Sequence, residues 1–169
     1  NYGIGGMFDT AIGSIIFINP DTSAIVASLI PDVSSSSSNR PWDIVYGDPN
    51  RQRLYSIGNP NSAGHDFIHV IDTSTHAEVG KSTYAGGYVR MCPAMAISSD
   101  KNSLYVFQSC QSPINISKYD LTTDTPTQIA SVPFGSSLTG KNIVLSADDS
   151  KILVDSGQVW SAGLKGRIG

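Results

Sequence analysis

The chain has 169 residues, of which 40% are hydrophobic and 15% are charged, and its formal net charge is -3 at pH 7. This composition is that of a globular protein with enough apolar residues for one core. Acidic and basic residues are scattered singly, so no basic stripe could follow a nucleic-acid backbone. Even the longest apolar runs, such as Ile15–Ile18, are far too short to cross a membrane as a helix. We therefore expect no nucleic-acid partner and no direct membrane insertion.

The two ends of the chain look cut. Asn1 is neither an initiator methionine nor part of a charged-then-apolar leader, and Gly169 follows shortly after a strand-like segment. We therefore expect residues 1–169 to be a fragment of a longer chain, with any targeting signal outside it.

A repeated unit dominates the sequence. Three tyrosine-led segments each run into an apolar strand that ends at a turn containing Asp and Thr. The aspartates of these turns are Asp21, Asp72 and Asp120. Their spacing of about 50 residues is that of a supersecondary repeat. Upstream of the second and third tyrosines, another apolar run and a polar turn predict a hairpin.

Each unit therefore has four strands, a to d. Residues 1–33 supply strands b to d, residues 42–84 and 92–133 supply complete units, and residues 142–164 supply strands a to c. Runs such as Leu104–Phe107 are apolar without alternation, which favours sheets buried on both faces. The sequence predicts an all-β protein, a β-propeller of four-stranded antiparallel blades. A sandwich could give similar runs, but not a repeat of whole units. The strands are too few for a complete ring, which favours an arc of a larger one.

The segments Ile97–Val106 and Ile68–Thr75 resemble the YVTN-type seven-bladed propeller repeats of surface-layer and extracellular proteins. The resemblance covers most of residues 1–164, and its motifs are structural. It implies an extracellular propeller in a surface assembly. The same order of apolar strands and polar turns also resembles lactonase-like and quinoprotein-like propellers, which are enzymes. The fold alone therefore leaves the function open.

The two cysteines fall symmetrically about one predicted hairpin. If that hairpin turns about Lys101, Cys92 and Cys110 are cross-strand partners, close enough for a disulfide. The alternative is two buried, unpaired thiols in a reducing compartment. We predict the disulfide, which implies an oxidising environment. Asn115 begins the sequence Asn-Ile-Ser, an acceptor for N-glycosylation. Both features favour a secreted or cell-surface protein.

Other polar residues give weaker indications. His65, Asp66 and His69 could share a metal, but the paired spacing of zinc motifs is missing, and we predict no metal site. The repeated aspartates could ligate calcium, but one acid per turn favours hydrogen bonds that close hairpins. Aromatic residues could stack on sugars or fill the core between blades. They are Trp42, Trp160, Tyr84, Tyr88 and Phe134.

No catalytic motif occurs in the sequence, and no cofactor site is predicted. Our hypothesis is a non-enzymatic extracellular propeller that serves as a structural or adhesive module, with other protein domains or copies of itself as partners. One alternative is an enzyme of the lactonase or quinoprotein-dehydrogenase type whose site lies on other blades. A second is a lectin-like propeller that binds carbohydrate.

Overall fold

The computed structural model describes residues 3–4, 14–31, 41–58, 65–89, 92–110, 113–135 and 142–169. Its regular elements within these ranges are all strands, which confirms the all-β prediction. No helix long and apolar enough to span a membrane occurs among these residues.

The strands form four antiparallel sheets in chain order. The first sheet has β1 (Gly3–Ile4), β2 (Ile15–Ile18) and β3 (Ile25–Leu29). The second has β4 (Pro41–Tyr46), β5 (Arg53–Gly58), β6 (Ile68–Asp72) and β7 (Ala77–Lys81). The third has β8 (Pro93–Ile97), β9 (Ser103–Gln108), β10 (Ile114–Asp120) and β11 (Thr127–Gly135). The fourth has β12 (Ile143–Leu145), β13 (Lys151–Val154) and β14 (Val159–Ser161).

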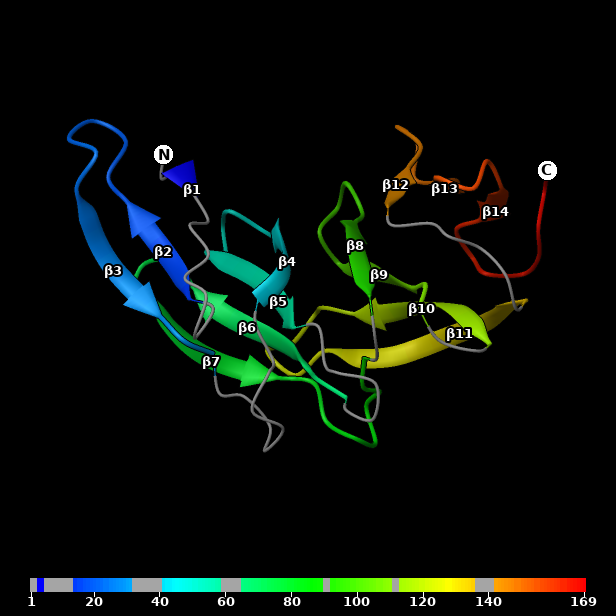
Figure 1. Cartoon of the computed structure of the whole chain (residues 1–169), viewed down its shortest axis with the longest axis horizontal. Helices are drawn as coiled ribbons and strands as arrows, with labels where there is room; N and C mark the ends of the chain where they lie inside the picture. Colours follow the sequence, from blue (N-terminus) through cyan, green and yellow to red (C-terminus); the bar gives the residue numbers. More distant parts are fainter. Residues whose placement is uncertain are drawn as a thin grey trace.

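The sheets follow one another along an open arc (Figure 1). The first strands of neighbouring sheets are in contact, β4 with β8 and β8 with β12. The outer strands β3, β7 and β11 lie on the convex side of the arc (Figure 1). Each sheet is a simple meander, because every strand pairs with its neighbours in sequence. Four-stranded meanders stacked face to face are the arrangement that the repeat predicts.

Equivalent backbone hydrogen bonds show that the sheets are copies of one unit. The turn after each first strand is closed by an N–H that donates across it, from Gly47 to Arg53, from Ser98 to Ser103 and from Ser146 to Lys151. After each third strand, an N–H donates to the preceding turn. These bonds run from Thr73 to Gln52, from Leu121 to Asn102 and from Ala162 to Ser150. The sequence repeat is therefore a repeat of structure.

The polar turns close hairpins, but one predicted member is displaced. Asp72 accepts the N–H groups of Ser74 and Thr75 at 2.8 and 3.0 Å. Asp120 accepts that of Thr122 at 2.8 Å. In the first sheet the acceptor is Asn19 rather than Asp21, whose own N–H donates to Asn19 Oδ1 at 2.9 Å. Asn fills the position because its side-chain oxygen accepts the same hydrogen bonds as a carboxylate.

Apolar side chains fill the space between successive sheets. Leu54 and Ile71 of the second sheet pack on Ile15 and Phe17 of the first. The second and third sheets meet through Tyr55, Val70, Val106 and Tyr119, among others. The third and fourth meet through Tyr105, Phe107, Ile152 and Trp160, among others. Each fully buried side chain contributes about 2 kcal/mol of transfer free energy. Stability is therefore concentrated between the sheets.

Candidate functional site

The strand order separates the connections onto two ends of each sheet. In a meander, the second and fourth connections of a unit lie at the end opposite to the first and third. Segments 65–67, 82–89 and 109–110 therefore share one end, which we call the loop face. The tight turns 47–52, 73–76, 98–102 and 146–150 share the other end, which we call the turn face.

Four aromatic rings gather on the loop face of the second sheet. His65 and Phe67 precede β6, and Tyr84 and Tyr88 lie in the connection from β7 to β8. The ring of Tyr84 lies 4.6 Å from that of His65, 5.2 Å from that of Phe67 and 5.8 Å from that of Tyr88. His65 Nε2 also contacts the Tyr84 hydroxyl. We call these four residues the aromatic surface.

The backbone beneath Tyr84 and Tyr88 is fixed between two sheets. Gly87 has a φ of 96°, which suits glycine, and its N–H donates to Tyr84 O at 3.4 Å. The N–H of Gln128, on β11, donates to Gly86 O at 2.6 Å. The hydroxyl of Tyr119, on β10, donates to Tyr88 O at 3.5 Å. Tyr84 is nevertheless 61% exposed. An exposed aromatic side chain thus lies on a loop whose backbone is hydrogen-bonded to the third sheet.

A buried cluster of ionisable groups lies under this surface. His69, on β6, has Nδ1 2.9 Å from Glu78 Oε1 and Nε2 3.3 Å from Asp66 Oδ1. Both nitrogens of the ring therefore face carboxylate oxygens, so neither is directed at a position where a substrate could give up a proton. Ser56, opposite His69 on β5, consequently has no activating base in this cluster.

The predicted combination of His65, Asp66 and His69 is only partly assembled. Asp66 and His69 meet, whereas His65 joins Tyr84 in the aromatic surface. Across the described ranges, no group of three or more His, Cys, Asp or Glu side chains is arranged to hold a metal ion. The sequence reasoning did not find Glu78, which reaches His69 from the next strand. Register between β6 and β7 was the missing information.

The structure describes the side chains of three of the five candidate aromatic residues, and it places them in two different environments. Tyr84 and Tyr88 reach the aromatic surface, whereas Trp160 is buried in the core between the third and fourth sheets. The side chains of Trp42 and Phe134 lie outside the described residues.

A disulfide joins Cys92 and Cys110 on the loop face of the third sheet, with their Cα atoms 5.3 Å apart. The register differs by one residue from the one predicted, because Pro93 pairs with Gln108. Cys92 therefore faces Ser109, whose N–H donates to Cys92 O at 3.4 Å. The φ of 50° at Cys92 departs from strand geometry and accompanies the offset pairing. The bridge ties the connection from β7 to β8 to the connection from β9 to β10.

Asn115 lies on the central strand β10 and is half-buried. Its Oδ1 atom is buried and has no hydrogen-bond partner among the described residues. A glycan on Asn115 would require the amide nitrogen to reach solvent past the flanking strands. Glycosylation at Asn115 stays a prediction.

Asp43 is a half-buried acid that the sequence reasoning missed. It lies on the innermost strand β4, and Met95 of β8 donates its N–H to Asp43 Oδ2 at 2.7 Å. The N–H of Ile44 donates to Oδ1 at 2.9 Å. Burial raises the pKa of Asp43, and these two bonds oppose that shift. Its carboxylate thus links two neighbouring sheets.

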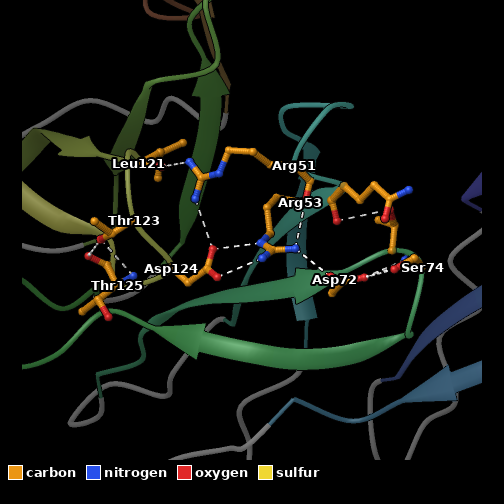
Figure 2. A network of polar contacts seen from close by, with 10 residues as sticks. Arg51, Arg53, Asp72, Ser74, Leu121, Thr123, Asp124 and Thr125 are labelled. Atoms are coloured by element: carbon orange, nitrogen blue, oxygen red, sulfur yellow. Dashed lines mark hydrogen bonds and ion pairs between the residues drawn. The ribbon is translucent and has the colours of Figure 1, made fainter.

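An arginine network joins the second and third sheets on the turn face (Figure 2). Arg53 Nε and Nη2 donate to the two carboxylate oxygens of Asp124 at 2.8 and 2.9 Å. Arg53 Nη1 donates to Asp72 Oδ2 at 2.7 Å. Arg51 donates to Leu121 O and, at 3.2 Å, to Asp124. Gly80 accommodates the Asp124 loop, because a Cβ there would lie 1.9 Å from Asp124 O. The network fixes one sheet against the next.

We expect Arg53→Met to lower the free energy of unfolding by about 2 kcal/mol, since it removes the guanidinium that donates to both Asp72 and Asp124. Asp124 is about a third exposed, so solvent screening limits the loss. Urea unfolding measures it. Lys151→Met, at an exposed lysine of β13, is the control and should change stability by less than about 0.5 kcal/mol. Equal stabilities for both variants would contradict a coupling role for Arg53.

The sequence matches no protein-family model and no curated protein. Solved structures do match. The Cps50 (Swd1) β-propeller domain from Myceliophteria thermophila is 12% identical with a TM-score of 0.68, over 99% of this chain and 54% of that one. The fold is a partial β-propeller.

Two further matches carry the names of enzymes. A putative 6-phosphogluconolactonase from Bacteroides uniformis is 16% identical with a TM-score of 0.61, over 95% of this chain and 47% of that one. Kuenenia stuttgartiensis hydrazine synthase is 20% identical with a TM-score of 0.58, over 76% of this chain and 34% of that one.

At these identities the likeness shows the fold alone, and this chain spans between about a third and about half of those structures. The narrower resemblance to YVTN-type repeats stays a prediction.

Proposed function

We propose that this propeller is a non-enzymatic interaction module that acts as a structural or adhesive part of a secreted or cell-surface protein. The observation that carries the proposal is Tyr84, 61% exposed on a loop held by hydrogen bonds to the third sheet. Tyrosine supplies a large contact area at low entropic cost, and a fixed backbone reduces that cost further. The partner we propose is another protein domain or a second copy of this chain.

The aromatic surface has the features of a contact hot spot. Its tyrosines and histidine combine apolar ring faces with polar tips, and Lys81 places its ammonium 5.8 Å from the Phe67 ring centre. Aromatic anchors surrounded by polar groups typically carry most of the energy of protein recognition. Sugars can also stack on tyrosine faces, so carbohydrate is the alternative ligand that the experiment distinguishes.

The secreted or cell-surface location is part of the same proposal. The bridge between Cys92 and Cys110 supports it, because disulfides persist mainly in oxidising compartments. A glycan on Asn115 would support it independently. A loss of mass when the native protein is deglycosylated enzymatically would show that modification directly.

The enzyme alternative rests on likeness of fold to proteins named as a lactonase and a synthase. His69, a buried histidine, does not favour an enzyme, because both of its ring nitrogens are bonded to carboxylates. Reproducible turnover of a lactone, or of an aldose with a quinone, that is lost in Asp66→Asn would support the enzyme instead.

We expect Tyr84→Ser to reduce adhesion of the protein to the cells that produce it about tenfold or more, because truncation of an aromatic hot-spot residue typically costs about 2 kcal/mol or more. Flow cytometry with labelled protein measures adhesion. Tyr46→Ser is the matched control, since Tyr46 is 47% exposed at the turn-face end of β4. Equal adhesion of both variants would contradict the proposed surface. Loss of binding after removal of cell-surface glycans, but not after protease treatment, would assign the ligand to carbohydrate.

A further inference from the structure

His69 is enclosed among groups that fix its protonation. It is 2% exposed, and each ring nitrogen faces a carboxylate, Glu78 at 2.9 Å and Asp66 at 3.3 Å. A neutral imidazole has one donor and one acceptor, whereas an ionised carboxylate only accepts. Two carboxylates are therefore satisfied together only by the doubly protonated ring. Burial alone lowers the pKa of His69, but the bonds to Asp66 and Glu78 outweigh it and raise the pKa to about 9.

Within the part of the chain that the structure describes, few other charges face this ring. On β5 its register partner is Ser56, and on β7 it is Lys81, which lies by the Phe67 ring. His69 stands two residues before Ile71 and shares the face that packs on the first sheet. Strands β2 and β3 of that sheet carry no ionisable side chain. Asp66 and Glu78 are thus the carboxylates that determine the charge of His69.

The cluster is linked through the backbone to the aromatic surface. The N–H of Asp66 donates to Val89 O at 2.8 Å, and the N–H of Val89 donates to Asp66 O at the same distance. His65 and Phe67 flank Asp66 in the sequence, and Val89 directly follows Tyr88. The position of Asp66 therefore determines the placement of its neighbours His65 and Phe67. Through Val89 it also determines the placement of the loop that carries the two tyrosines.

We propose that His69 is a positioning residue for the aromatic surface, a buried imidazolium that holds Asp66 and, through the paired backbone of Asp66 and Val89, the loop that carries Tyr84 and Tyr88. Loss of its proton leaves two carboxylates, that of the buried Asp66 and that of the half-buried Glu78, facing a ring with one donor. Asp66 is then released from His69, and the bridge to Val89 opens more often. The inference concerns the regulation of the surface described under Proposed function, but its test needs no partner.

The pH dependence follows from the direction of the shift. The folded-state pKa of His69 lies above its ordinary value of 6.5. The contribution of the imidazolium is therefore fully present below about pH 6.5 and is lost as the pH rises through about 9. Over that range the loop 82–89 should lose protection while the sheets, held by their apolar interfaces, stay folded.

The experiment is amide hydrogen exchange of the intact protein from about pH 6 to about pH 10, corrected for the intrinsic exchange rate. In the native protein, protection of the peptide that contains Val89 should fall across this range. In His69→Gln it should be about tenfold lower at pH 7 and independent of pH. Peptides from β9 and β10 serve as the internal control and should be unaffected. Unchanged loop protection in a folded His69→Gln protein would overturn the proposal.

Glu78→Gln provides a second variant in case His69→Gln does not fold. The amide oxygen that this substitution introduces can still accept from His69 Nδ1, but the charge that stabilises the imidazolium is gone. The pH at which the loop loses protection should then fall, together with the midpoint of the His69 ring measured by NMR. A pH dependence of the loop that does not move with the His69 midpoint would overturn the proposal. If loop protection depends on pH as expected but Tyr84→Ser adheres as well as the native protein, the interaction function is contradicted and the positioning role of His69 still holds.

Discussion

Replacement of both cysteines by serine, in Cys92→Ser/Cys110→Ser, should lower the free energy of unfolding by about 3 kcal/mol. The bridge closes a loop with a sequence separation of 18, and it constrains the unfolded chain in the loop-entropy model. Denaturant unfolding of the two proteins measures the difference. Reductant should destabilise the native protein by a similar amount and leave the double variant unchanged, which is the matched control.

The same disulfide is open to a direct chemical test. Alkylation of the native protein without reductant, followed by mass spectrometry, should label neither Cys92 nor Cys110. Labelling of both thiols in the folded protein would contradict the bridge and remove the main support for an oxidising compartment. A bridge that contributes less than about 1 kcal/mol would show that the loop face is held mainly by its hydrogen bonds.

The fold could be predicted because the repeat recurs in elements that the chain forms locally. Apolar runs about 50 residues apart, each with its polar turn, define one hairpin unit without any knowledge of long-range contacts. Positions that depend on register were harder to predict. Asn19, which replaces Asp21 as the acceptor, follows a register shift between Phe17 and Ile18. The hairpin of β8 and β9 pairs regularly, but its register lies one residue away from the one predicted at Cys92. A slip of one residue changes every cross-strand partner, and composition carries no signal for it.

The candidate site could be predicted only in part for the same reason. His65, Asp66 and His69 stood out because they are close in the sequence. Glu78 and the aromatic partners come from β7 and the following connection, and only the folded sheet brings them to His69 and His65. A histidine in a strand with an acid about ten residues later across a tight turn is a pairing signal worth searching for.

The end sheets differ from the inner sheets in what covers them. Leu153 occupies on β13 the position that Tyr55 and Tyr105 occupy on β5 and β9, as the registers of the three sheets show. Tyr55 and Tyr105 are buried by the sheet that follows them. Leu153 and its partner Val144 are 40% and 55% exposed. The repeat itself thus identifies what this face fits, namely another four-stranded sheet.

We therefore expect residues 1–169, expressed alone, to self-associate and to bind a hydrophobic dye strongly, because an uncovered sheet face exposes contiguous apolar surface. Sedimentation velocity and dye fluorescence measure the two effects. The variant Val144→Thr/Leu153→Thr should reduce both, since it removes apolar groups that no described sheet covers. The matched control Val154→Thr alters a buried residue of the same strand and should lower stability instead. A monomeric 1–169 protein that melts cooperatively and binds little dye would contradict the prediction that these sheets are part of a larger ring, because the strands would then have to close into a small ring by themselves.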